Sequence, residues 1–311
     1  MKKILCIGFA LLLFATVCFA ADETITFDFP NIMSENPDDL PENVDIENGF
    51  HNSIWIGKLS TTCTLGLPVT YRFDNLNLEG YGAASFGLMS QHADENSSID
   101  LTYITESGKE FTDSIPLTTT AAKFYTVKLP ETHEKIVCFK MYINSFTPDK
   151  SMFDVELEFL KFHKGSSVML LSTKEAFALH DGEEIIPQSP AVIRDGSTLT
   201  PARFVAERFG AEVEWIASER KVIITKEEWT KDEGFVGVTK IELIIDSKTA
   251  LVNGEEKELA YPACIIDDYT YTPARFVAEN LGCNVDWDAQ TKTVFIVDKY
   301  EFWKVGVDDA K

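Results

Sequence analysis

The first part of the chain, residues 22–163, alternates between apolar and polar positions with a period of two. The alternation runs through six segments: Thr24 to Phe29, Val69 to Phe73, Ile99 to Tyr103, Phe124 to Leu129, Ile136 to Ile143 and Phe153 to Phe162. Gly, Asn, Asp and Pro separate these segments, and helix signals are almost absent. A period of two sends successive side chains to opposite faces of a strand. The pattern therefore predicts an all-β, jelly-roll-like antiparallel sandwich.

The last of these segments is expected to be a half-buried strand. Its odd-numbered positions from Phe153 to Phe159 are apolar, and the opposite phase carries acids at 154, 156 and 158, followed by Leu160. This arrangement predicts one buried face and one acidic outer face.

The pattern changes after a short polar linker, residues 164–167. From Val168 onward, strand segments alternate with one short helical segment per repeat. Thr200 to Glu207 recurs letter for letter as Thr272 to Glu279, 72 positions later. A gapless match that continues on both sides indicates one supersecondary unit built twice. Each copy is too small to bury a core alone, so residues 168–298 are expected to form one α+β module. Residues 299–311 are predicted to be a charged tail.

Each repeat carries signals for the ends of its helix. Thr200 is a candidate N-cap, Pro201 a candidate first helical residue, and Gly210 is placed to end the helix in the left-handed conformation. Strands are predicted at Val213 to Trp215 and Val222 to Thr225, and the second copy repeats them with Trp287 and Val294 to Val297. Asn253-Gly254 predicts a type I′ hairpin.

Residues 1–20 are expected to be a signal peptide. Lys2 and Lys3 precede an apolar run, and Cys18-Phe19-Ala20 places small residues at the −3 and −1 positions of a cleavage site. Lipidation of Cys18 is the alternative, although the bulky Val17 before it argues against this. No later segment is long and apolar enough to cross a membrane. The chain is therefore expected to be secreted, or associated with the cell surface or cell wall.

The formal net charge of −22 restricts the possible partners. Such an acidic chain repels nucleic acids and anionic lipid headgroups, and it attracts cations and basic surfaces. Solubility outside the cell also explains the charge.

Four cysteines remain after the expected cleavage: Cys63, Cys138, Cys264 and Cys283. Their spacing does not match a metal site. Pairing within each domain is the simplest disulfide pattern for an exported chain, and buried free thiols are the alternative. The first repeat has Val192 and Ala211 at the positions of Cys264 and Cys283, which favours free thiols.

The repeated region resembles the copper amine oxidase N-terminal-like domain, a stalk domain common in exported proteins of Gram-positive bacteria. The matching residues are Ile241 to Leu243, Ser247 to Gly254, Pro262, Thr272 to Glu279, Leu281-Gly282 and Val285 to Asp288. The sequence departs from the family at Ala202 and Ala274, where the family more often has Leu. The resemblance covers residues 168–298 and implies a small α+β stalk module that does not itself carry copper.

The residues agree that no oxidase site is present. Amine oxidase chemistry needs a Tyr-derived quinone in an Asn-Tyr setting and three His ligands, but the chain has no Asn-Tyr pair and no His-x-His among its five histidines.

The first domain more loosely resembles jelly-roll carbohydrate-binding modules. That resemblance rests on Val69 to Phe73, Gly80 to Met89, Phe124 to Leu129 and Ile136 to Ile143.

Candidate ligand-binding residues in the first domain are Trp55, Tyr71, Asp74, Tyr81 and Tyr103. The aromatic faces could stack on sugar rings, and Asp74 could hydrogen-bond hydroxyls together with neighbouring asparagines. In a sandwich most aromatic side chains belong to the core, which is the competing interpretation. Trp55 is the foremost candidate because it lies in a polar, Gly-containing stretch.

The repeat residues Pro201, Arg203, Glu207, Gly210 and Trp215 recur as Pro273, Arg275, Glu279, Gly282 and Trp287. The Arg and Glu of each copy are spaced for an i,i+4 ion pair, which is favoured over a role as ligand-binding arginines. The tryptophans occupy the apolar phase of their strands and are interpreted as core anchors rather than sugar platforms.

The acidic loop with Asp38, Asp39, Glu42, Asp45 and Glu47 could hold Ca²⁺, but no EF-hand spacing supports this and a solvated loop is favoured. Otherwise no cofactor is predicted.

The sequence predicts a non-catalytic exported protein of the bacterial envelope. Its sandwich would bind a cell-wall glycan or a surface protein and would be carried on the stalk module. The alternatives are a purely structural or protein-interaction role, and a glycan hydrolase with unassigned carboxylates.

Overall fold

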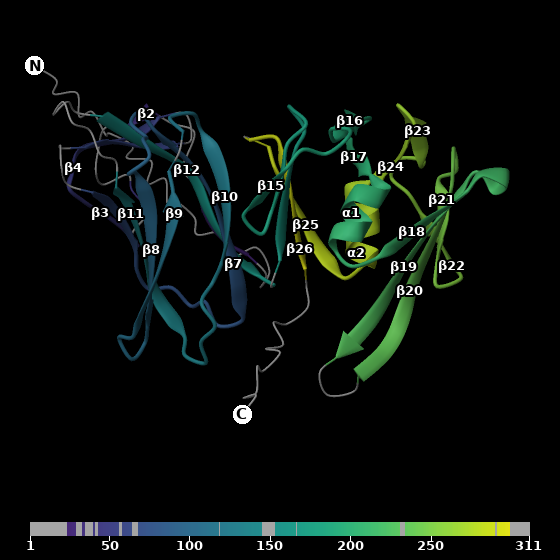
Figure 1. Ribbon diagram of the computed structural model, residues 1–311, viewed down its shortest axis with the longest axis horizontal. Coiled ribbons are helices and arrows are strands. Elements are labelled where there is room, and N and C mark those ends of the chain that lie inside the picture. Colours follow the sequence, from purple (N-terminus) through teal and green to yellow (C-terminus); the bar gives the residue numbers. More distant parts are fainter. Residues whose placement is uncertain are drawn as a thin grey trace, which may run out of the picture.

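The computed structural model describes residues 24–28, 33–34, 40, 43–55, 58–63, 68–117, 119–144, 153–165, 167–230, 234–289 and 291–298. The expected signal peptide, the tail at 299–311 and the loop positions Asp38, Asp39 and Glu42 lie outside these residues. The described chain is mostly β and forms five sheets. Two of them make a sandwich at one end, and the other three make a C-terminal module with two short helices (Figure 1).

The first sheet of the sandwich has seven strands in the order β10-β7-β12-β5-β4-β2, with β1 paired to β12 outside this path. Its strands are β1 (Thr24–Asp28), β2 (Met33–Ser34), β4 (Gly49–Trp55), β5 (Lys58–Cys63), β7 (Tyr81–Ser90), β10 (Lys123–Lys128) and β12 (Phe153–Lys164). The second sheet has five strands in the order β3-β6-β11-β8-β9. These strands are β3 (Val44–Glu47), β6 (Val69–Phe73), β8 (Ser98–Thr105), β9 (Glu110–Pro116) and β11 (Ile136–Asn144).

The inner faces of the two sheets share one hydrophobic core. Aromatic rings meet edge to face across it, with centroids 5.0 Å apart for Phe27 and Phe73 and 5.3 Å apart for Phe139 and Phe162. Such contacts add specific geometry to the burial of large apolar surfaces. The predicted β-sandwich is therefore confirmed, and all six predicted strand segments are strands.

The prediction for β12 was wrong in one respect. The register shifts between Leu157 and Phe159. An extra residue of this kind inverts the alternation beyond it. Leu157 and Leu160 both belong to the sandwich core, whereas Phe159 belongs to a separate cluster on the outer face. The outer face of β12 is thus acidic only before the bulge, and beyond it is covered by the C-terminal module.

The C-terminal module contains the other three sheets. One sheet has the order β15-β14-β13-β26-β25, the second β16-β17-β24-β23, and the third β18-β19-β20-β21-β22. The strands are β13 (Val168–Ser172), β14 (Ala178–His180), β15 (Glu183–Ile185), β16 (Val192–Arg194), β17 (Ser197–Pro201), β18 (Glu212–Ile216), β19 (Lys221–Thr230), β20 (Gly234–Ile244), β21 (Thr249–Val252), β22 (Glu255–Glu258), β23 (Cys264–Ile266), β24 (Tyr269–Pro273), β25 (Cys283–Asp288) and β26 (Thr293–Asp298). The helices are α1 (Ala202–Arg208), α2 (Ala274–Asn280) and a 3₁₀ turn, η2 (Ala217–Glu219).

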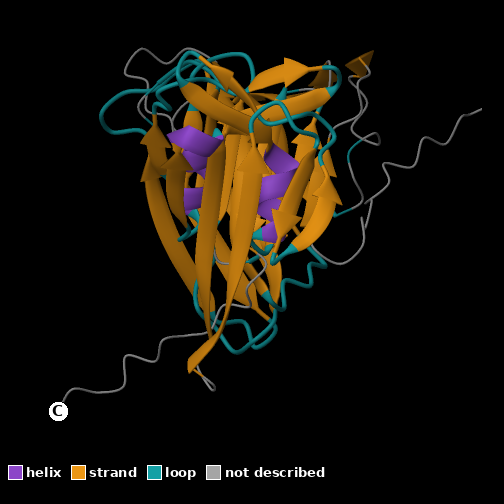
Figure 2. Cartoon of the chain, turned by 90° about the vertical axis from the view of Figure 1, so that its right-hand side faces the viewer, coloured by secondary structure: helices purple, strands orange, loops and turns teal. Residues whose placement is uncertain are grey.

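The two sequence copies are interlocked. Strand β13, which opens the first copy, pairs with β26, which closes the second. In the middle sheet, β17 and β24 run antiparallel with Thr200 opposite Thr272, the same position of the repeat in each copy. This pairing places a pseudo-two-fold axis between the two threonines. Helices α1 and α2 lie between the two outer sheets, and each contributes side chains to both of the module's cores (Figure 2).

The helix start differs from the prediction. Helix α1 begins at Ala202, Pro201 is its N-cap residue, and no side chain caps it. Thr200 is therefore not the N-cap. It is a residue of strand β17, and its side-chain hydroxyl is buried. Two other local predictions are confirmed. Gly210 has a φ of +78°, and Asn253 and Gly254, between β21 and β22, both have positive φ, as a type I′ turn requires.

The described cysteines are free thiols, and Cys63, Cys138 and Cys283 are buried. Burial raises the pKa of Cys63 to about 12 and that of Cys138 to about 11. They thus behave as small hydrophobic side chains. Among the described residues, no helix is long and apolar enough to cross a membrane.

Candidate functional site

Two of the predicted sugar-binding aromatics are core residues. Tyr71 and Tyr103 have 0% and 1% of their surfaces exposed, inside the sandwich. Their strands were predicted correctly, but these positions face the opposite sheet. A ring enclosed on both faces cannot stack on a ligand, so the binding prediction for Tyr71 and Tyr103 was wrong.

Trp55 ends strand β4, where it pairs with Lys58 of β5 and Met33 of β2, and its side chain lies outside the described part. Asp74 follows β6 and forms a two-contact ion pair with Arg72, at 2.6 and 2.9 Å. The hydrogen bonds from Arg72 hold the pKa of the Asp74 carboxyl below its usual value. Asp74 is thus paired with a residue of the preceding strand β6, and its part in ligand binding stays a prediction.

The remaining predicted residue, Tyr81, lines a cleft of about 440 Å³ at one end of the sandwich. The cleft (hereafter the end cleft) is bounded by residues 78–82 at the start of β7, by Glu106 in the β8–β9 turn, and by residues 129–136 between β10 and β11. Its size lies in the range of small-ligand sites, about 300–1,000 Å³.

Backbone hydrogen bonds hold the three segments of the end cleft together. The amide of Leu129 donates to the carbonyl of Gly82 at 2.9 Å, and the amide of Glu106 donates to the carbonyl of Lys135, also at 2.9 Å. Gly80, with a φ of +77°, allows the tight turn into β7. The cleft is therefore built on the rigid ends of sandwich strands, an arrangement that favours pre-organised binding.

Carboxylates dominate the polar lining of the end cleft. Glu79, Glu106, Glu131 and Glu134 line it, together with His133 and Lys135. Glu134 accepts a 2.5 Å hydrogen bond from the Ser107 hydroxyl, which helps to lower its pKa. Ionised carboxylates accept hydrogen bonds at several lone pairs and hence suit ligands rich in donors such as hydroxyls.

The Tyr81 ring forms the aromatic part of this lining. It packs partly against the sandwich core, and Lys164 Nζ lies 5.6 Å from its centroid. Tyr81 was predicted from the sequence, but the glutamates were not. The acids cluster at Glu131 and Glu134, in a short loop between two predicted strands, and that concentration was the only available signal.

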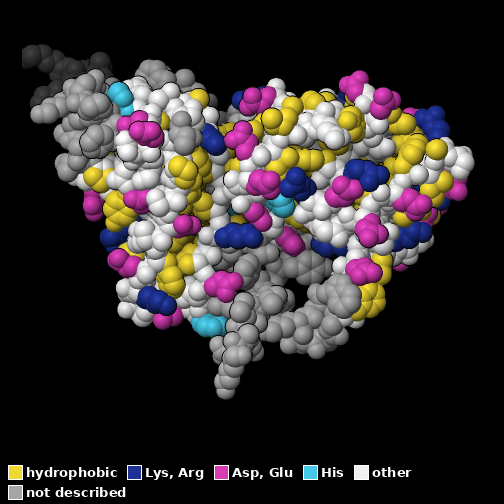
Figure 3. Space-filling view, viewed as in Figure 1, with side chains coloured by type: hydrophobic (Ala, Val, Ile, Leu, Met, Phe, Trp, Pro, Cys, Tyr) yellow, Lys and Arg dark blue, Asp and Glu magenta, His cyan; other side chains and the backbone are white. Residues whose placement is uncertain are grey.

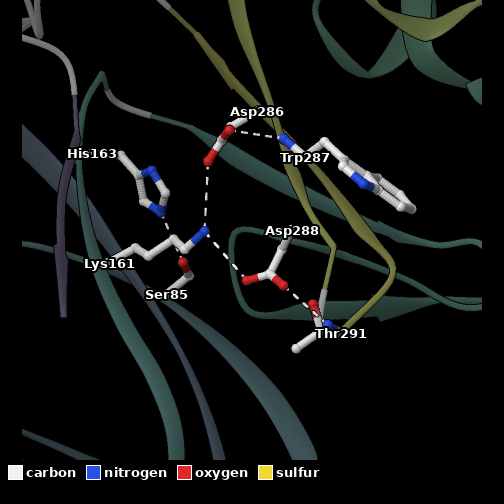
Figure 4. Close-up of polar contacts among 7 residues, drawn as sticks. All are labelled: Ser85, Lys161, His163, Asp286, Trp287, Asp288 and Thr291. Carbon is white, nitrogen blue, oxygen red and sulfur yellow. Dashed lines mark hydrogen bonds and ion pairs between the residues drawn. The ribbon is translucent and has the colours of Figure 1, made fainter. Parts of the chain in front are cut away.

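A second polar cluster lies at the junction between the sandwich and the C-terminal module (Figure 4). Lys161 of β12 has 5% of its side chain exposed and reaches Asp286 at 3.5 Å and Asp288 at 3.4 Å, both on β25. On the same face of β12, His163 Nε2 lies 2.7 Å from the Ser85 hydroxyl. Burial, with the nearby Lys161 charge, lowers the pKa of His163 to about 3.

An apolar cluster surrounds these groups and joins the two parts of the chain. It combines Ala83 and Phe159 of the sandwich with Val168, Leu170, Leu179, Phe295 and Val297 of the module. Lys161 Nζ also lies 4.6 Å from the centre of the Phe295 ring. These contacts make the junction a structural interface with a buried ion pair.

The repeat residues take positions that the sequence predicted in part. Arg203 bonds Glu207 and Arg275 bonds Glu279, each at 2.9 Å, as expected for i,i+4 pairs. Pro273 is the N-cap residue of α2, and Gly282 has a φ of +86°. Trp287 packs against one module core. Trp215, in contrast, is 39% exposed, so its assignment as a core anchor was wrong. It lines a surface groove together with Ala202 and Arg203 at the start of α1.

Calcium binding by the acidic loop stays a hypothesis, because Asp38, Asp39 and Glu42 lie outside the described residues. Asp45 and Glu47 lie on β3 with exposed side chains. Across the described residues, no three His, Cys, Asp or Glu side chains cluster in a way that could hold a metal ion.

Comparison with solved structures finds similar but distant chains. One structure of a family 29 carbohydrate-binding module shares 10% identity, covers 46% of this chain and 87% of its own, and has a TM-score of 0.33. Another structure of that family shares 11% identity over 46% of this chain and 93% of its own, with a TM-score of 0.34. The agarase AgWH50C shares 11% identity over 40% of this chain and 24% of its own, with a TM-score of 0.32. Likenesses at this level carry no argument about function.

No curated protein matches the chain. The model of one family, the copper amine oxidase N-terminal domain, matches residues 153–224 and 180–296. Together these matches span the C-terminal module and begin within β12. The resemblance read from the repeated motif is thereby confirmed: the C-terminal part of this chain matches the copper amine oxidase N-terminal domain family.

Proposed function

We propose that this is a non-catalytic, exported protein of the bacterial cell envelope that binds a glycan through the end cleft of its sandwich. The C-terminal module acts as the stalk that carries the sandwich. Export rests on the signal-peptide pattern of residues 1–20.

The observation that carries the proposal is the composition of the end cleft. A partly exposed tyrosine ring stands beside four glutamates in a cavity of about 440 Å³. An aromatic surface can pack on the C–H face of a pyranose, while carboxylates accept hydrogen bonds from its hydroxyls. A strongly acidic cleft disfavours anionic polymers, so a neutral or amino-bearing cell-wall polysaccharide is the expected ligand.

The test is binding of the full chain to an array of purified cell-wall polysaccharides. We expect saturable binding that free sugar competes away, and that Glu131→Gln weakens at least tenfold, about 1.4 kcal/mol. Glu131 is exposed, so the substitution should leave the fold intact. Glu110→Gln is the matched control, because Glu110 is an exposed glutamate on the edge strand β9, outside the cleft.

Three results would contradict the proposal. If no polysaccharide binds, or if Glu131→Gln and Glu110→Gln bind equally well, the end cleft is not a glycan site. If the bound polysaccharide becomes shorter during incubation, the protein is a hydrolase and the non-catalytic part of the proposal is wrong.

A further inference from the structure

The C-terminal module carries two surface grooves that correspond to each other through its internal repeat. Groove A, about 500 Å³, is lined by Arg203, Trp215 and Ile265; groove B, about 440 Å³, by Arg275, Trp287 and Ile193. Every lining residue of groove A has a counterpart 72 positions away that lines groove B. The pseudo-two-fold axis between Thr200 and Thr272 therefore relates two equivalent sites.

Each groove is assembled from both copies of the repeat. In groove A, the Trp and Arg come from the first copy and Ile265 from the second; in groove B, Trp287 and Arg275 come from the second copy and Ile193 from the first. Neither groove exists until the two copies interlock. The duplication thus creates a pair of binding surfaces in addition to a shared core.

The grooves expose apolar side chains that a solvated surface would not require. Ile193 is 51% exposed, Ile265 45% and Trp215 39%. In the described part of the chain, every exposed large hydrophobic residue lies between positions 186 and 265, in the C-terminal module. Hydrophobic side chains gather accordingly along the upper surface of this module (Figure 3). Apolar patches of this kind mark interaction sites.

The walls of each groove include strands at the edges of sheets. Groove A runs between β18, an edge of one sheet, and β23, an edge of the middle sheet. Groove B runs between the corresponding edge strands, β25 and β16. Edge strands can pair with an added extended segment, which then places alternate side chains into neighbouring pockets.

The charges around the grooves select the partner further. Asp268 lines groove A, and Asp267 beside it corresponds in the repeat to Asp195, next to Gly196 of groove B; all three carboxylates are exposed. The arginine of each groove is already paired with a glutamate of its own helix. Because the chain has a net charge of −22 and the groove arginines are already paired, the exposed carboxylates favour a basic segment over an acidic one.

Groove B also lies close to the junction with the sandwich. Asp286 and Asp288 turn toward Lys161, while the Trp287 side chain between them points away from that ion pair (Figure 4). This alternation is the period of a strand. Groove B therefore remains on the face of β25 opposite the Lys161 cluster.

We propose that grooves A and B each bind an extended segment of a partner polypeptide, with a bulky apolar side chain between the Trp and the Ile and basic side chains on either side. This activity is independent of glycan binding in the end cleft. One stalk module would then hold two such segments, and so could cross-link partner chains.

The test starts with a displayed library of random nonapeptides selected on the full chain, followed by calorimetric titration of an enriched peptide. We expect enriched sequences that alternate apolar and basic residues, and a stoichiometry of two peptides per chain. Trp215→Ala should remove one site, and Ile193→Asp should remove the other. Both residues are exposed, so neither change should affect the fold, which thermal unfolding checks.

Val238→Ala is the matched control, since Val238 is 45% exposed on the same module but lines neither groove. It should retain both sites, and so should Glu131→Gln in the end cleft. The proposal is overturned if no peptide family is enriched, if the double variant Trp215→Ala/Ile193→Asp still binds the enriched peptides, or if Trp215→Ala abolishes binding of a polysaccharide instead.

Discussion

Replacement of Lys161 by alanine tests whether the buried ion pair holds the sandwich on its stalk. The Lys161 side chain is 5% exposed, and its ammonium group lies between Asp286 and Asp288, whose side chains are 59% and 10% exposed. Its removal would leave the Asp288 carboxylate buried without its cation. Breaking a buried pair in this way costs about 3–5 kcal/mol. Because the Asp286 carboxylate is largely solvated, it does not need the Lys161 charge. We therefore expect the free energy of unfolding to fall by an amount near the lower limit, about 3 kcal/mol.

The assay is urea unfolding of the full chain, followed by both fluorescence and circular dichroism. The matched control is Lys123→Ala, because Lys123 also joins the sandwich to the module, through Glu184 at 3.2 Å, but with 31% and 52% of the two side chains exposed. An exposed pair contributes about 0–1 kcal/mol. The double variant Lys161→Met/Asp288→Leu should recover most of the loss, because it removes both charges. If Lys161→Ala costs no more than Lys123→Ala, the buried ion pair does not hold the sandwich on its stalk.

Two further predictions concern the same junction. Gly165, in the linker, has a φ of +140°, and an added Cβ would lie 1.9 Å from the carbonyl oxygen of Asp298. Gly165→Ala should therefore lower the free energy of unfolding by about 3 kcal/mol or more, as measured by thermal unfolding. Gly196→Ala, at a φ of +77° with open space around it, should cost only about 1 kcal/mol, and equal losses would argue against the clash. The folded-state pKa of His163 is about 3, against 6.5 for a model histidine, so the unfolded chain takes up the proton first as the pH falls. Stability should thus drop by about 2 kcal/mol from this group between pH 7 and pH 5. His163→Gln should remove that part of the pH dependence, and an unchanged pH profile would show that His163 is not buried in its neutral form.

The alternation of side chains predicted the strands whose two faces differ, and it failed where they do not. Strand β7 packs on the sandwich core through Phe86 and on the C-terminal module through Ala83. A strand covered on both faces has no period of two, so its sequence of small and apolar residues carries no strand signal. Strand β9 was missed for the opposite reason: it is an edge strand whose residues are mostly exposed rather than covered on both faces.

The candidate site could be predicted only in part. Alternation shows that Tyr71 and Tyr103 share a face with apolar neighbours, but a single sequence does not distinguish a core face from a binding face. The glutamates of the end cleft come from three loops that the fold brings together. The interlocked copies were beyond prediction for a similar reason. The repeat indicates equivalent strands, but it does not determine that β13 pairs with β26.

The most direct test of glycan binding by the end cleft is NMR mapping of backbone amides on the full chain. The ligand is the polysaccharide that the array identifies, titrated as a short oligosaccharide. We expect amide shifts to concentrate at residues 79–82, at Glu106 and at 129–136, and to saturate with the binding isotherm. Saturable shifts that spare these three segments and appear at the grooves of the C-terminal module or on the β4–β5 strands would contradict this expectation.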